Sequence, residues 1–192
     1  GSGVGKSEIA SLLAHYFENM GVGCYTLSGD NYPHRIPVYN DAERLRIFRE
    51  SAIRGMITDG EYSFERFNII HQYQLENKDS EPKNIVKYPW YESYIRNGAM
   101  GLQGYLGTEK EINFFEIQNI VKEFKSGAEK IWLKRMGRED TELWYEEVDF
   151  SEKDILIIEW THGNSKNYTG VDIPVLLNST PKETLAHRRS SR

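Results

Sequence analysis

The chain begins with Gly1-Ser2-Gly3-Val4-Gly5-Lys6-Ser7, a glycine-rich turn that ends in a lysine and a serine. Glycines at alternate positions let the backbone wrap around a phosphate without clashes from Cβ atoms. The amides of such a turn, and the N-terminus of the helix after it, then point at the anion. We therefore expect this loop to bind ATP, with Lys6 on the β and γ oxygens and the Ser7 hydroxyl on Mg²⁺.

The loop departs from the full pattern for a Walker A phosphate loop, G-x-x-x-x-G-K-[ST], whose first glycine would lie one position before Gly1. A strand normally leads into such a loop. We expect that a first strand is missing ahead of Gly1, and that the C-terminal run from Arg188 to Arg192 is cut short or joined across an omitted stretch.

Length and composition limit the class of protein. A chain of 192 residues suits one compact α/β domain. Its net charge of −5 gives no basic field for a nucleic-acid partner. The single cysteine, Cys24, rules out an internal disulfide, which fits a cytoplasmic location. The run Ile155–Ile158 is too short to span a membrane. The sequence does not decide the oligomeric state, and a homo-oligomer is one of the alternatives.

Hydrophobic periodicity predicts alternating helices and strands. The helical spacings cover residues 9–20, 45–53 (after a cap at Asp41), 111–125 and a last helix from Pro181. The β-prone runs cover residues 24–27, 130–133, 143–148, 155–158 and 173–177. This alternation predicts an α/β fold with a doubly wound parallel sheet, of the kind found in P-loop nucleoside triphosphate hydrolases.

Residues 60–110 give no clear pattern, apart from an exposed loop expected over 77–83. We interpret 60–110 as an insertion in the single domain that recognises the acceptor substrate. An alternative is a partner-binding surface that carries the aromatic side chains of Tyr88, Trp90, Tyr91 and Tyr94, although lining of a core or pocket is the favoured explanation of these side chains.

Asp30 comes directly after the predicted strand 24–27, at the carboxyl edge of the sheet where ligands of α/β proteins bind. A carboxylate there can accept the proton of an attacking hydroxyl and contact Mg²⁺. An Asx turn is the plainer explanation of Asp30 taken alone. Next to a phosphate-binding loop, we interpret Asp30 as the catalytic base.

Glu159 ends the predicted strand 155–158. A carboxylate at this position can hold Mg²⁺ directly or through water. The alternative is a solvent-facing carboxylate at a strand end. The continuous apolar character of the strand indicates a central position in the sheet and favours the catalytic interpretation.

Several further residues are candidates for contacts with substrate or nucleotide. Tyr32, His34 and Arg35 follow Asp30 on one loop and could bind the acceptor, although a solvated loop is the alternative. Arg138, after the strand 130–133, is another candidate. Arg188 and Arg189 could close over the phosphates, or simply complement the C-terminus of a helix.

These motifs resemble those of the phosphoribulokinase and uridine kinase family. Gly29-Asp30-Asn31-Tyr32-Pro33-His34-Arg35 resembles that family's Gly-Asp-Ser-Phe-His-Arg, with one extra residue before His34. Glu159-Trp160-Thr161-His162-Gly163 resembles its Glu-Gly-Leu-His-Gly, with Trp160 in place of a glycine. The C-terminal part is similar to the family's last core strand and arginine-rich helix. The resemblance implies that Asp30 is the base and adds His162 to the substrate site; it does not extend to residues 60–110.

Adenylylsulfate kinase is a rival resemblance, because its Gly-Asp-Asn stretch is similar to Gly29-Asp30-Asn31. It explains Glu159–Gly163 and the long central segment less well. The sequence therefore predicts an ATP-dependent, Mg²⁺-dependent kinase that phosphorylates a hydroxyl of a small metabolite, of the sugar phosphate or nucleoside type. A nucleotide-dependent binding or regulatory ATPase is the alternative from another class.

Overall fold

The computed structural model describes residues 5–178 of the chain. It divides into two compact units: the first combines residues up to Ile36 with those from Ile112 onward, and the second runs from Pro37 to Glu111. The predicted insertion at 60–110 lies within the second unit. That the chain is one domain, and that this segment recognises an acceptor, stay predictions.

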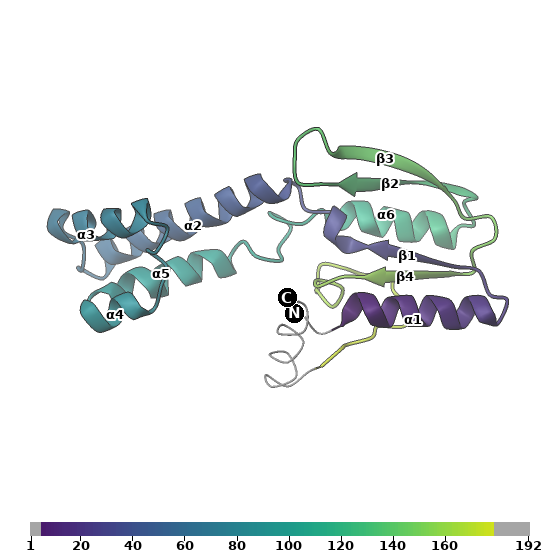
Figure 1. Cartoon of the computed structure of the whole chain (residues 1–192), viewed down its shortest axis with the longest axis horizontal. Helices are drawn as coiled ribbons and strands as arrows, with labels where there is room; N and C mark the ends of the chain where they lie inside the picture. The colour runs from purple at the N-terminus through teal and green to yellow at the C-terminus, as the bar shows by residue number, and fades with distance from the viewer. Residues whose placement is uncertain (1–4, 179–192) are drawn as a thin grey trace. The chain divides into compact units, whose positions relative to one another are not determined.

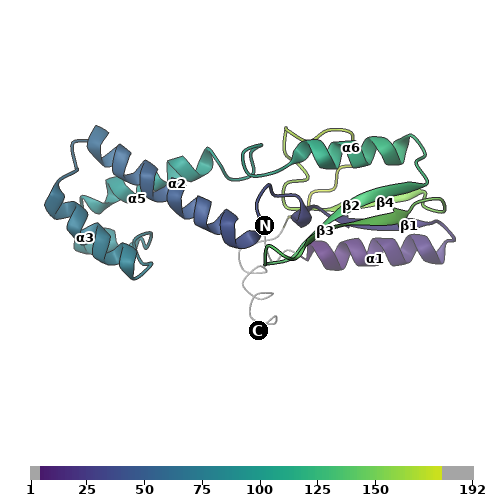
Figure 2. The same ribbon diagram turned by 90° about the horizontal axis from the view of Figure 1, so that it is seen from above.

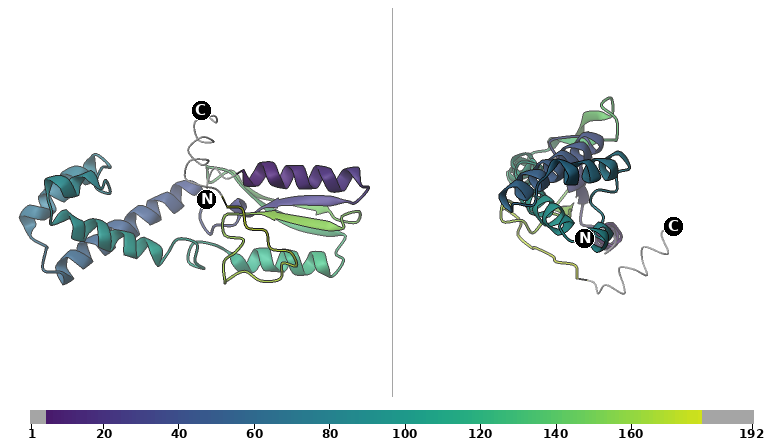
Figure 3. Two further views of the ribbon diagram at one scale, coloured as in Figure 1. Left: turned by 90° about the horizontal axis from the view of Figure 1, so that it is seen from below. Right: turned by 90° about the vertical axis from the view of Figure 1, so that its left-hand side faces the viewer.

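The first unit contains a parallel pair of strands, β1 (Cys24–Ser28) and β4 (Ile155–Glu159), in which Cys24 pairs with Ile155 and Ser28 with Glu159 (Figure 1). Helix α1 (Lys6–Asn19) lies on one face of these strands and α6 (Phe114–Lys125) on the other (Figures 2 and 3). The predicted α/β class and parallel pairing are confirmed. The parallel order also brings the carboxyl ends of both strands to one edge.

Strands β2 (Lys130–Met136) and β3 (Leu143–Asp149) form an antiparallel hairpin, a two-stranded sheet of its own. Both strands were predicted, but their assignment to one parallel sheet was wrong. The physical reason is the short link over residues 137–142. A parallel crossover needs a dozen or more residues, whereas an antiparallel return needs only a turn.

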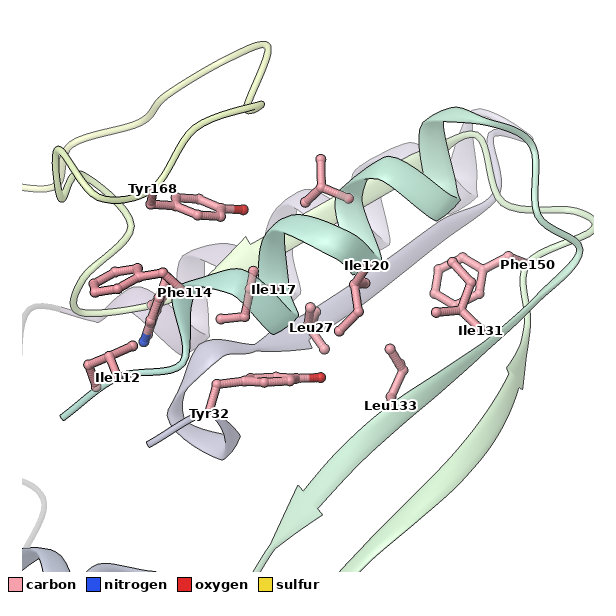
Figure 4. Packing of buried hydrophobic residues seen from close by; sticks show 12 residues of the cluster. Leu27, Tyr32, Ile112, Phe114, Ile117, Ile120, Ile131, Leu133, Phe150 and Tyr168 are labelled. Atoms are coloured by element: carbon pink, nitrogen blue, oxygen red, sulfur yellow. The ribbon is translucent and has the colours of Figure 1, made fainter. Parts of the chain in front are cut away.

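The core of the first unit lies between α6, β1 and the hairpin (Figure 4). Leu27 of β1 faces Ile117 and Ile120 of α6, and Leu133 of β2 completes the contact. The spacing of Ile117, Ile120 and Val121 is that of one helix face, which explains why α6 forms and packs here. Asn113 caps this helix by accepting a hydrogen bond from the Glu116 amide.

The strand predicted over residues 173–177 is absent from the structure. Ile173, Val175 and Leu176 are exposed. Pro174 lies within this run and has no N–H to give to a sheet. On α1, Leu12, Tyr16 and Met20 are likewise exposed, although the predicted helix itself is confirmed.

The second unit is helical, with α2 (Pro37–Thr58), α3 (Phe64–Leu75), α4 (Lys83–Lys87) and α5 (Tyr91–Gln103). Its core is formed by Phe48, Ala52, Met56, Ile70, Tyr91 and Tyr94. Tyr91 and Tyr94 are fully buried, and Tyr88 and Trp90 pack against the same core. The aromatic residues of this segment therefore form a core, which removes the reason for reading them as a partner surface.

Asp79 links several helices of the second unit. The expected exposed loop over 77–83 is a turn, but the Asp79 side chain is buried within it. Arg49 donates two hydrogen bonds to this carboxylate, at 2.8 and 3.0 Å, and the Tyr94 hydroxyl donates a third at 2.8 Å. A buried charge requires such partners, because an unpaired carboxylate in a core is strongly destabilising.

Glu111, the last residue of the second unit, is also buried. Its carboxylate accepts hydrogen bonds from Asn40 and Arg44 near the start of α2, and from the amide of Gly107. These contacts hold the beginning and the end of the second unit together. Over residues 5–178, none of the helices is long and apolar enough to cross a membrane.

Candidate functional site

The N-terminus of α1 is the first element of the site. Gly5 precedes the helix with φ 73° and ψ 27°, a left-handed conformation that favours glycine. The Ile9 amide donates to the Gly5 carbonyl at 3.0 Å, so the helix is closed from its first turn. Lys6 and Ser7 therefore lie in the first turn of a 14-residue helix, whose N-terminus carries the positive end of the dipole. Gly1, Ser2, Gly3 and Val4 lie outside the described residues.

Lys6 and Glu159 meet at the carboxyl edge of the parallel strands. The Lys6 ammonium lies 3.8 Å from a carboxylate oxygen of Glu159. Their side chains are only 21% and 11% exposed, so water screens this pair less than a surface ion pair. Two residues far apart in the sequence, one from each predicted motif, are thus brought together.

Asp30 lies at the end of the neighbouring strand. It is the middle residue of a short 3-10 turn, η1 (Gly29–Asn31), which directly follows β1. Because Ser28 is paired with Glu159, the turn that carries Asp30 begins one residue beyond the partner of Glu159. Asp30 is exposed, so a bound molecule can reach its carboxylate.

Gly29 and Trp160 hold these two strand ends in contact. Trp160 follows Glu159 and is buried, with its ring against Phe114, His162 and Tyr168. A Cβ added at Gly29 would overlap the Trp160 indole. Glycine at position 29 therefore allows the indole to pack directly on the turn that carries Asp30. The sequence identified Trp160 only as a departure from a family motif and gave no sign of this contact.

Tyr32 does not lie where a substrate contact was predicted. Its side chain is fully buried in the core of the first unit, near Leu27 and Leu133 (Figure 4). Burial raises the pKa of its hydroxyl, which has no hydrogen-bond partner within the described residues. Burial of the apolar ring stabilises the fold more than exposure on a loop would. Tyr32 therefore has a structural role in the core next to the turn that carries Asp30.

The other predicted substrate residues are spread over three segments. His34 and Arg35 are exposed on the loop after η1. Arg138 is exposed in the turn between β2 and β3, where its amide donates to a Glu142 carboxylate oxygen at 2.7 Å. His162 is half-buried beside the Trp160 ring, with ring centroids 5.8 Å apart. Arg188 and Arg189 lie outside the described residues.

The loop after η1 is fastened to its surroundings by three hydrogen bonds. The Met136 amide donates to the Asn31 side-chain oxygen at 3.0 Å, and the Asn113 amide donates to the Tyr32 carbonyl at 2.8 Å. The Lys134 ammonium donates to the Pro33 carbonyl at 3.1 Å. The sequence did not predict the roles of the three donors, Met136, Asn113 and Lys134. Two of them act through backbone amides and the third is a single lysine in a strand, and neither forms a recognisable motif.

Comparison with known proteins gives one informative relative. The chain is 40% identical over 188 residues to a protein named bifunctional alpha-galactosidase/sucrose kinase AgaSK, from Mediterraneibacter gnavus. The alignment covers 98% of this chain but only 15% of that protein's length. No family model matches the chain, so its placement with phosphoribulokinase and uridine kinase stays a prediction. No solved structure matches it either.

Proposed function

We propose that this chain is a kinase that transfers the γ-phosphate of ATP to a hydroxyl group of a small sugar. The observation that carries the proposal is the approach of Lys6 to Glu159 where α1 begins and β4 ends. Phosphoryl transfer needs positive charge at the γ-phosphate and a carboxylate that holds Mg²⁺. Lys6 ends the predicted phosphate-binding loop with Ser7, and Glu159 ends the predicted strand 155–158.

The residues present fit ATP and Mg²⁺. The left-handed Gly5 and the first turn of α1 offer backbone amides to phosphate oxygens. The described residues contain no group of three or more His, Cys, Asp or Glu side chains arranged to hold a metal ion. This suits Mg²⁺, which typically takes one or two carboxylates, with phosphate oxygens and water completing its shell. Bound there, Mg²⁺ would neutralise charge on the phosphates.

In this proposal each side chain has a distinct role. Lys6 binds the β and γ oxygens, Ser7 and Glu159 hold the metal ion, and Asp30 accepts the proton of the attacking hydroxyl and contributes to the metal shell.

The acceptor lies against His34, Arg35, Arg138 and His162. Arg188 and Arg189 close over the phosphates. Phosphoribulokinase-like and uridine kinase-like chemistry assigns the same base.

The similarity to a protein named as a sucrose kinase supports an uncharged sugar as the acceptor. We therefore place neutral sugars, sucrose first among them, ahead of the sugar phosphates and nucleosides suggested by the family resemblance. The chain spans about 15% of the relative's length, and of the two activities in that name the kinase is the one that agrees with the contact between Lys6 and Glu159. A cytoplasmic location agrees with the use of ATP.

The test is to incubate the chain with Mg-ATP and one acceptor at a time, and to measure both ADP release and phosphorylated product by mass. The panel contains sucrose, other neutral sugars, sugar phosphates, nucleosides and adenylylsulfate. A sugar-dependent rise in ADP with matching phosphosugar supports the proposal. A product only from adenylylsulfate would assign the rival kinase, and ADP release without any phosphorylated product would indicate a regulatory ATPase.

A further inference from the structure

Lys134 of β2 is a buried charge in the first unit that the proposed chemistry does not use. Its side chain is 6% exposed, and within residues 5–36 and 112–178 it is the one charged side chain that is buried. Its neighbours in the strand, Leu133 and Ile131, are core residues. The Lys134 ammonium donates to the Pro33 carbonyl at 3.1 Å.

Packing alone does not explain a lysine at this position. Burial lowers the pKa of the Lys134 ammonium, and attraction to Glu116 offsets only part of that effect. A methionine would fill a similar volume without desolvating a charge, and apolar replacements of buried charges are often neutral or stabilising. The lysine therefore contributes a contact that an apolar side chain cannot make.

The contact is with the loop that carries the acceptor residues. Pro33 lies between the buried Tyr32 and the exposed His34, three residues after Asp30. Asn31 and Tyr32 are each held by a backbone amide, from Met136 and Asn113. The next residue, Pro33, forms a backbone bridge with Ile112 and also accepts the Lys134 hydrogen bond. Lys134 therefore adds a side-chain contact at the residue directly before His34 and Arg35.

We propose that Lys134 is a positioning residue for the acceptor: by holding the Pro33 carbonyl, it sets where Asp30, His34 and Arg35 meet the acceptor hydroxyl. This inference rests on the proposed kinase function. Lys134 itself touches neither substrate nor nucleotide. Its loss should weaken the use of the acceptor while leaving the nucleotide at Lys6 unaffected, because Lys6 lies on α1 and is held by other contacts.

The experiment compares Lys134→Met with Lys130→Met in the full chain. Lys130 lies on the same strand but is exposed and paired with Glu147 at 3.0 Å. Loss of one hydrogen bond from a charged donor corresponds to a change of roughly tenfold in binding. Lys134→Met should raise the KM for the sugar by about that factor and leave the KM for ATP unchanged. Lys130→Met should change neither.

Amide hydrogen exchange tests the positioning without any substrate. In Lys134→Met, exchange should accelerate at residues 31–36 and stay unchanged in α1. If this variant does not fold, Lys134→Arg replaces it: the longer side chain keeps the donor but displaces the loop, so the sugar KM should still move alone. An unchanged sugar KM, or parallel changes in both KM values, would overturn the inference.

The two proposals fail in different ways. If the kinase function is wrong, the unmodified chain forms no phosphorylated sugar, and this is seen before any variant is compared. Exchange at residues 31–36 then still reports whether Lys134 holds the loop. If the kinase function is right and Lys134 is only a packing residue, product forms normally and Lys134→Met lowers stability without separating the two KM values.

Discussion

The ammonium of Lys6 lies 3.8 Å from a carboxylate oxygen of Glu159, at the point where the first turn of α1 meets the end of β4. Both side chains are largely withdrawn from solvent, so the attraction between them is stronger than between exposed charges. In the proposed kinase, this arrangement presents a cation and an anion to Mg-ATP.

Replacement of Lys6 by alanine should strongly reduce phosphoryl transfer. Lys6→Ala removes the positive charge predicted to neutralise the γ-phosphate, and removal of one such group costs about 100-fold in turnover. Steady-state ADP release with saturating sugar measures the effect. Lys6→Arg, which retains the charge with a different shape, should keep part of the activity. Full activity in Lys6→Ala would show that the nucleotide is bound elsewhere.

Glu159→Gln should increase the Mg²⁺ concentration needed for activity. The amide keeps the size of the side chain but loses the charge that attracts a divalent cation. We expect roughly a tenfold shift in the Mg²⁺ dependence, as is usual when a supporting metal contact is lost. Asp154→Asn is the matched control, since Asp154 is exposed just before the other end of β4. An unchanged Mg²⁺ titration would assign Glu159 to the ion pair with Lys6 alone.

Asp30→Asn should slow turnover without weakening nucleotide binding. The amide cannot accept the proton of the attacking hydroxyl, and loss of a general base lowers rates by about 100-fold or more. Nucleotide affinity, measured by equilibrium titration, should be unchanged because Asp30 lies on η1 rather than on α1. Asp41→Asn, at an exposed residue of α2, serves as the control. Loss of nucleotide affinity would instead show that the metal contact or a structural role, and not proton transfer, is the main contribution of Asp30.

Gly29→Ala should destabilise the first unit and reduce activity together. The added Cβ overlaps the Trp160 indole, so either the η1 turn or the ring has to move. Forcing an extra methyl into a packed site costs about 1–3 kcal/mol, which urea denaturation can detect. Gly104→Ala is the control: the nearest atom to its added Cβ is 3.4 Å away, and its φ of −76° is open to alanine. A Gly29→Ala variant of unchanged stability would show that the indole moves freely.

Asp79→Asn should destabilise the second unit by about 2 kcal/mol, because it leaves the half-buried Arg49 guanidinium without its charged hydrogen-bond partner. Burial raises the pKa of Asp79, but hydrogen bonds from Arg49 and Tyr94 outweigh it and hold this pKa below its ordinary value. The stabilisation is therefore full above the unfolded pKa of about 3.9 and is lost as the pH falls through the lower folded pKa.

Urea denaturation at several pH values checks the Asp79 prediction. The unmodified chain should lose stability on acidification below about pH 4, and Asp79→Asn should show a flatter acid dependence. Glu76→Gln is the control, because the exposed pair between Glu76 and Lys78 adds little to stability. Identical acid profiles for the unmodified chain and Asp79→Asn would contradict the role given to this carboxylate.

The parts of the structure that the sequence predicted are those with strong local patterns. The strand 24–27 and the helix 111–125 correspond to β1 and α6, because a short β-prone run and a regular apolar spacing were both unambiguous. The approach of Lys6 to Glu159 follows from parallel strand order, which places strand ends at one edge. The candidate site was therefore predicted in its outline from two motifs.

The remaining features depend on contacts that leave no local signature. Alternation along β2 would have placed Lys134 on the solvent side, opposite Leu133, yet the loop after η1 covers it. The helices within residues 60–110 contribute Ile70 and two tyrosines, Tyr91 and Tyr94, to the buried core, so their apolar spacing is weak. The run 173–177 has a strand-like composition. A strand also needs a neighbouring strand to pair with, and composition does not show whether one is present.

The carboxylate of Glu111 has a consequence for how this protein can change. It ties the start of α2 to the end of the second unit, while in the first unit Pro33 and Ile112 are bridged across the same interruption of the chain. In each unit, a contact therefore joins the two chain segments that meet at the border between the units. The helical segment between residues 36 and 112 can accordingly be replaced by another segment without breaking the bridge that closes the first unit.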